Sequence, residues 1–148
     1  MDEFGGRLEA TALHTGAARL ADTSKRREQI AASRYTAKRS YNYASLLNVS
    51  KRPEEAKSLL HEVTPVARRT LGDPHELTLT MRGLYAELLY RSPGATFADI
   101  RESVTTLEDV DRIARRVLGS PHPVTKAIVL QLQNARVALR TRKTQSRK

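Results

Sequence analysis

One nine-residue motif occurs twice in this chain and restricts the folds that the chain can adopt. Residues 67–75 read Ala-Arg-Arg-Thr-Leu-Gly-Asp-Pro-His, and residues 114–122 read Ala-Arg-Arg-Val-Leu-Gly-Ser-Pro-His. Gly119 follows Gly72 by 47 residues. A self-similar unit of this length, in a chain with helical patterning, is typical of helical repeat arrays.

The residues inside the motif predict a helix end, a tight turn and a new helix. The Leu-Gly step ends a helix, because glycine readily adopts the left-handed conformation that follows the last turn. Asp73 or Ser120 is expected to cap the next helix, and the proline after it suits the first helical position. In the first copy Glu76 can complete a capping box with Asp73.

Apolar residues recur at three- and four-residue steps along most of the chain, which predicts amphipathic helices. Asp22-Thr-Ser24 should stop the first helix and cap the second, and residues 1–6 should be loose. No segment alternates apolar and polar residues over a useful length, so we expect an all-α fold. The predicted helices span residues 7–21, 25–48, 53–71, 74–90, 96–118 and 121–142.

The composition excludes several classes of protein. No run of about 18 apolar residues is present, so no membrane span is expected. The chain has no cysteine, which leaves no disulfide or thiolate metal site and fits an intracellular, cytoplasmic protein. A P-loop and a Gly-x-Ser-x-Gly elbow are both missing from the sequence, so we expect neither an enzyme nor a cofactor.

The net charge of +10 is concentrated at the two ends of the chain. Residues 1–52 carry ten Lys and Arg against five Asp and Glu, and residues 114–148 carry nine against none. Basic residues with interleaved tyrosines near residues 25–52 leave RNA or DNA binding open as an alternative function. An acidic protein partner explains the same charge. Residues 143–148 are expected to form a basic disordered tail.

A second register supports the repeat. Tyr43-Ala-Ser-Leu-Leu matches Tyr85-Ala-Glu-Leu-Leu at a step of 42 residues. The large and small pair Tyr43 and Ala44, followed by Leu47, Ala56 and Leu60, resembles the tetratricopeptide (TPR) pattern. The junction Leu-Gly-Asp-Pro-His with Thr78, and its copy at residues 118–125, resembles the kinesin-light-chain type of this repeat, whose unit exceeds the basic period of roughly 34 residues. The resemblance covers about residues 36–139.

The resemblance implies a short right-handed α-α superhelix of antiparallel helix pairs. Its units would span about residues 25–72 and 73–119, with a capping helix at 121–142 and a loose N-terminus plus a leading helix in residues 1–24. The family binds an extended peptide or a partner helix on the concave face, so the resemblance implies a non-catalytic protein-interaction module or scaffold. On this chain the groove would carry Lys38, Tyr41, Asn42, Ser45, Asn48, Thr80, Gly83, Glu87, Tyr90 and Arg91.

Two further alternatives concern the histidines and the ends of the array. His75 and His122 occupy matching repeat positions, which would place them on the order of 10 Å apart if the helices pack normally. Zinc ligands lie about 2 Å from the metal, so we expect each histidine to form a hydrogen bond at its own junction instead. The end helices could also pair with another copy, which would make the chain a self-associating unit or a fragment of a longer repeat protein.

Overall fold

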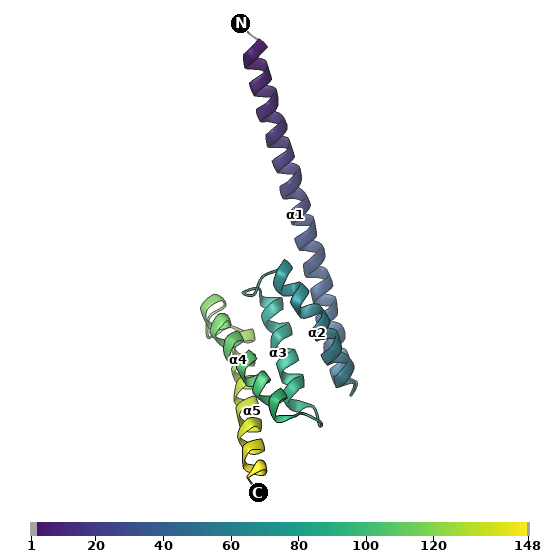
Figure 1. Cartoon of the computed structure of the whole chain (residues 1–148), viewed down its shortest axis with the longest axis vertical. Coiled ribbons are helices and arrows are strands. Elements are labelled where there is room, and N and C mark those ends of the chain that lie inside the picture. The colour runs from purple at the N-terminus through teal and green to yellow at the C-terminus, as the bar shows by residue number, and fades with distance from the viewer. Residues whose placement is uncertain (1–2, 148) are drawn as a thin grey trace.

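The computed structural model describes residues 3–147, and the side chains from Leu13 to Arg147. This range folds into five helices joined by short turns and contains no strand, which confirms the all-α prediction for it (Figure 1). The helices are α1 (Glu3–Val49), α2 (Pro53–Thr70), α3 (Glu76–Arg91), α4 (Phe97–Val117) and α5 (Pro123–Ser146).

The predicted break at residues 22–24 is wrong, because α1 passes through this segment without interruption. The side chains that suggested a stop are bonded within the helix. The Thr23 hydroxyl donates to the Arg19 carbonyl oxygen at 2.8 Å, and the Asp22 carboxylate lies 3.5 Å from the Arg26 guanidinium. Such local bonds let a residue that favours caps sit inside a helix. Residues 3–6, expected to be loose, are helical as well, and residues 1–2 lie outside the described range.

At both repeated junctions the glycine has the predicted conformation, but the residue that caps the next helix is not the predicted one. Gly72 and Gly119 have φ values of 92° and 87°, so both are left-handed. The residues that cap α3 and α5 are His75 and His122, rather than Asp73 and Ser120. Each imidazole Nδ1 accepts the backbone N–H two residues later at 3.1 Å, which confirms the predicted junction hydrogen bonds.

Asp73 is unavailable as a cap because another group holds its carboxylate. The Arg68 guanidinium at the end of α2 donates to Asp73 Oδ1 at 2.6 Å. The helix α3 starts at Glu76, two residues later than expected, and the predicted capping box with Glu76 is wrong. The helix α5 likewise starts two residues later than expected, at Pro123. The box motif does form at α4, where the Thr96 hydroxyl accepts the Asp99 N–H and Asp99 accepts the Thr96 N–H.

The helix α5 extends beyond its predicted end. It continues to Ser146, so residues 143–146 are helical rather than part of a disordered tail. The Arg142 side chain contributes a tertiary contact here, because its Nη2 donates to the Ala95 carbonyl oxygen in the turn between α3 and α4. Residue 148 lies outside the described range.

The core consists of two clusters that share α3. The first joins α1, α2 and α3 through residues such as Ala44, Leu60 and Leu88. The second joins α3, α4 and α5 through residues such as Ala86, Leu107 and Leu132. Each cluster thus fills the space among three consecutive helices, and α3 is covered on both sides.

The N-terminal part of α1 extends well beyond the other four helices (Figure 1). From Leu13 to Ala32 every residue except Gly16 is exposed. Among the described side chains of α1, which begin at Leu13, the first buried one is Ala37, where the helix meets α2. Over the described residues, none of the helices is both long and apolar enough to cross a membrane.

Candidate functional site

Three helices that are not consecutive in the chain meet on one side of the molecule. The helix α3 packs against α1 and against α5, in addition to its neighbours α2 and α4. Between α1, α3 and α5 lies an opening of about 280 Å³. We call it the groove pocket, and its lining residues are Tyr41, Thr80, Leu84, Glu87, Pro123, Val124, Ala127, Ile128 and Gln131.

The floor of the groove pocket is apolar and its rim is polar. Leu84 and Ile128 belong to the two core clusters and are almost fully buried. The Thr80 hydroxyl donates to the Glu76 carbonyl oxygen within α3 at 2.7 Å, so it presents its methyl group and an acceptor oxygen. A small apolar floor with a few polar groups is the usual composition of a recognition site.

A hydrogen-bonded set fixes the geometry of the rim. Glu87 Oε2 accepts from Gln131 Nε2 at 3.0 Å, and Glu87 Oε1 accepts from Arg91 Nη1 at 2.7 Å. A Cβ at Gly83 would lie 2.8 Å from Gln131 Oε1, so a larger residue at this position would require the end of the Gln131 side chain to move. Glu87 therefore holds α5 through Gln131 and has its charge compensated by Arg91.

The structure brings only part of the predicted groove set to this pocket. Tyr41, Thr80 and Glu87 line it directly, and Gly83 lies against Gln131. Arg91 reaches it only by pairing with Glu87. The remaining predicted residues do not line the pocket. Lys38 and Asn42 are exposed on α1, and the other three, Ser45, Asn48 and Tyr90, are partly buried.

Tyr90 belongs to the core rather than to the pocket. Its ring packs against the cluster shared by α3, α4 and α5. Burial raises the pKa of its phenol above the ordinary value, and the nearby Glu87 carboxylate acts in the same direction. This side chain therefore remains neutral and serves the packing between helices.

Sequence reasoning missed the contribution of α5, which was predicted to be only a cap. Its pocket residues Pro123, Val124, Ala127, Ile128 and Gln131 each lie 47 residues after a residue of α3. Ala127 thus corresponds to Thr80, and Gln131 to Leu84. The repeat step that identified the junctions also marks α5 as a third copy of the groove-lining helix.

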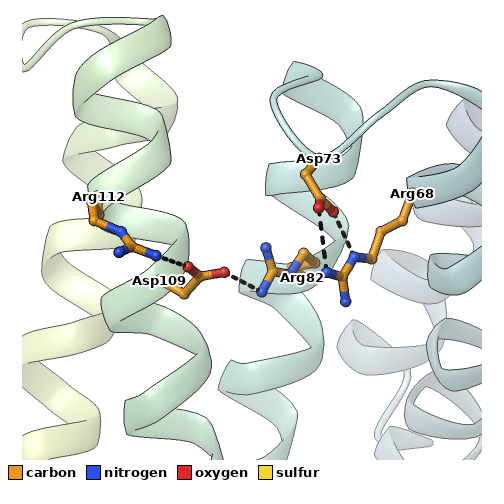
Figure 2. A network of polar contacts seen from close by, with 5 residues as sticks. All are labelled: Arg68, Asp73, Arg82, Asp109 and Arg112. Atoms are coloured by element: carbon orange, nitrogen blue, oxygen red, sulfur yellow. Dashed lines mark hydrogen bonds and ion pairs between the residues drawn. The ribbon is translucent and has the colours of Figure 1, made fainter.

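Polar contacts also join α3 to α4, and α2 to the turn that follows it (Figure 2). Arg82 is a buried residue of α3, and its Nη2 donates to Asp109 Oδ2 on α4 at 2.8 Å. Arg112 pairs with the other oxygen of Asp109, while Arg68 and Asp73 form a separate pair nearby.

The arginines in these contacts change the titration of the two carboxyl groups. The hydrogen bond from Arg82 lowers the pKa of Asp109, and the Arg112 guanidinium acts in the same direction. The hydrogen bond from Arg68 lowers the pKa of Asp73 in the same way. Both carboxylates therefore stay ionised to lower pH than in the unfolded chain, which suits structural ion pairs.

Within the part of the chain that the structure describes, no three His, Asp or Glu side chains are grouped so as to hold a metal ion. Comparison of the chain with protein-family models, with curated proteins and with solved structures gives no match. The function must therefore be argued from the groove pocket and from the exposed surfaces.

Proposed function

We propose that this chain is a non-catalytic interaction module that binds a peptide or a helix of a protein partner in the groove formed by α1, α3 and α5. In this proposal the five helices form a short right-handed TPR-type superhelix, in which these three helices line the concave face. The observation that carries the proposal is that the groove pocket draws residues from all three helices.

The lining residues favour a particular kind of ligand. Leu84, Val124 and Ala127 offer apolar contact to one side chain of the ligand. The Tyr41 hydroxyl and the Gln131 amide can form hydrogen bonds with its main chain. Because each helix that carries these groups packs on at least one core cluster, the pocket is formed before binding, which reduces the entropic cost of association. The proposed setting is intracellular and cytoplasmic, in keeping with a chain free of cysteine.

The test is selection of peptides from a displayed random library, followed by NMR mapping of the amide shifts on the full chain. We expect shifts at residues of α1, α3 and α5 that surround the pocket. Ala127→Arg should abolish binding, because a long charged side chain fills the pocket from an exposed position. Gln133→Arg is the matched control, since this residue is also exposed on α5 but does not line the pocket.

Equal binding by Ala127→Arg and the parent chain would refute the groove as the binding site. A pull-down from lysate, with and without nuclease and at low and high salt, addresses the alternative. Recovery of nucleic acid that is lost at high salt would assign the function to the basic ends of the chain instead.

A further inference from the structure

The helix α1 carries an apolar stripe on the side that faces away from the other helices. We call it the α1 stripe, and its apolar members include Leu13, Leu20, Ala31, Tyr35, Leu46 and Val49. These residues are 7, 11, 4, 11 and 3 positions apart. At about 100° per residue these positions fall within an arc of about 80°, so the residues lie on one side of the helix.

The stripe is exposed along its whole length. Leu20 is 74% exposed, Leu46 60% and Val49 80%. The residues of α1 that contact α2, such as Ala37 and Ala44, lie on the opposite side of the helix. Polar residues such as Ser24 and Asn42 divide the stripe into three apolar groups, all on one side of the helix. Exposed apolar groups of this kind often mark an interface.

The single chain also leaves the N-terminal part of α1 without tertiary support. Between Leu13 and Ala32 this segment contains Gly16, Thr23 and Ser24, which are weak helix formers. An unsupported helix of such composition is marginal in water, because most helical stability in proteins comes from packing of one face. A partner on the stripe would supply that packing.

We propose that the occupant of the α1 stripe is the α1 stripe of a second copy of this chain, in antiparallel orientation. In a register centred on residue 33, Leu20 lies opposite Leu46 of the second copy, and Ala17 lies opposite Val49. Ala31 and Tyr35 pair across the centre, and Ser24 meets Asn42. Within residues 17–49, apolar stripe residues thus meet apolar ones and polar residues meet polar ones, while Leu13 extends beyond the end of α1 of the second copy.

The charges on one flank of the stripe fit this orientation. Glu28 and Arg39 are eleven residues apart, so they lie about 20° from each other around the helix. In an antiparallel pair each flank of one helix meets the same flank of the other, which brings Glu28 beside Arg39 of the second copy, twice in the dimer. In a parallel pair opposite flanks meet, so Glu28 could not reach Arg39 of the second copy, and Arg39 would instead lie beside the flank that carries Lys38.

The other flank predicts an unusual response to salt. Arg27 and Lys38 lie on this flank, and the same register places Arg27 near Lys38 of the second copy. Residues 13–49 of each copy carry seven Lys and Arg against two Asp and Glu, so repulsion between the two helices exceeds the attraction of the Glu28–Arg39 pairs. Screening weakens this net repulsion as the salt concentration rises. Association of the chain should therefore strengthen with salt, whereas binding of nucleic acid weakens with salt.

The first experiment is sedimentation of the full chain as a function of concentration and salt. We expect a monomer–dimer equilibrium that shifts toward the dimer at higher salt. Leu20→Asp and Leu46→Asp should each give a monomer, and both positions are exposed, so the rest of the chain remains folded. Ala18→Asp is the matched control, because Ala18 is an exposed residue of α1 that lies off the stripe.

Cysteine cross-linking defines the orientation, because the natural chain contains no cysteine. Leu20 and Leu46 are 26 residues apart in one helix, or about 39 Å, so they can join only between copies. We expect a covalent dimer from Leu20→Cys/Leu46→Cys under mild oxidation, and little from either single variant. Charge reversal gives a second criterion: Glu28→Arg should weaken the dimer, and Glu28→Arg/Arg39→Glu should restore it.

Several outcomes would overturn the proposal. A chain that stays monomeric at every concentration and salt level has no such interface. Efficient cross-linking of the single Leu20→Cys variant would show a parallel pair. Dimers that persist in both Leu20→Asp and Leu46→Asp would show that another surface is used. None of these outcomes bears on peptide binding in the groove, which uses a different side of α1.

Discussion

The helices α1 and α3 contain the same local pattern but have different surroundings. Ala44 and Ala86 occupy matching positions, and both are fully buried. Leu46 and Leu88 also match, yet Leu46 is 60% exposed and Leu88 only 2%. The difference arises because α3 is packed between two core clusters, whereas α1 contributes to one. An identical pattern thus defines a core position in one helix and an open surface in the other.

Truncation of the two matched leucines tests this difference most directly. Leu88→Ala should lower the free energy of unfolding by about 2–5 kcal/mol, because it leaves a cavity in a packed core. Leu46→Ala should cost less than about 0.5 kcal/mol in dilute solution, where the chain is monomeric. Urea denaturation at low protein concentration measures both values. Similar losses in the two variants would show that α1 is covered on its outer side even in the monomer.

The ion pair of Arg82 and Asp109 has no equivalent in α1, where Ser40 occupies the position that matches Arg82. Asp109→Asn should cost about 1–3 kcal/mol, because it leaves the buried guanidinium of Arg82 without its carboxylate. Glu108→Gln is the control, since Glu108 forms only an exposed pair with Arg136. Chemical denaturation at neutral pH provides the comparison, and equal effects of the two variants would contradict the assignment.

The lowered pKa of Asp109 predicts a specific dependence of stability on pH. Its unfolded pKa is near 3.8, and its folded pKa is lower. The carboxylate therefore contributes stability above pH 3.8, and this contribution is lost as the pH falls from that value through the folded pKa. Unfolding curves of the parent and of Asp109→Asn should converge in this acidic range. A difference that persists undiminished at the lowest pH would exclude titration of Asp109 as the cause.

The two glycine junctions allow a comparison in which equal effects are expected. Gly119→Val places a β-branched residue at positive φ and should cost roughly 1 kcal/mol or more. Gly72→Ala and Gly119→Ala should cost similar amounts, since in both cases the nearest atom to a new Cβ is 3.6 Å or more away and backbone conformation alone opposes the change. Thermal unfolding measures these variants, and Gly94→Ala is the control because Gly94 does not have a positive φ.

The smallest effects should come from the histidine caps. His75→Ala and His122→Ala each remove the side chain that accepts the N–H of the second residue of a helix, at a cost of roughly 0.5–1 kcal/mol. His14→Ala is the control, because His14 is exposed on α1. Guanidinium titrations have the resolution for this comparison. Caps that can be removed without any loss would mean that water replaces the imidazole at both junctions.

The features that can be predicted from the sequence are those that depend on a few neighbouring residues. Helical periodicity and the left-handed glycines depend on short segments, so the helical fold and the two turns could be predicted directly from the residues. The continuity of α1 could not, because Asp22 and Thr23 can cap a new helix or bond within an existing one. The caps of α3 and α5 could not either, since at both junctions the imidazole of His75 or His122, and not Asp73 or Ser120, accepts the N–H of the first turn. The 47-residue repeat step could have predicted that α5 lines the pocket. The polar residues of α5 indicated a cap instead.

The unbroken path of α1 through residues 22–24 has a consequence for how the chain tolerates insertions and deletions. A continuous helix turns by about 100° with each residue, so the number of residues sets the angular phase between its two ends. One residue inserted at this point would rotate Leu13 and Leu20 by roughly a quarter turn relative to Leu46 and to the groove. Seven inserted residues would return them to nearly the same direction. In this region the number of residues determines the relative orientation of the two ends of α1, even at positions where the type of residue has little effect.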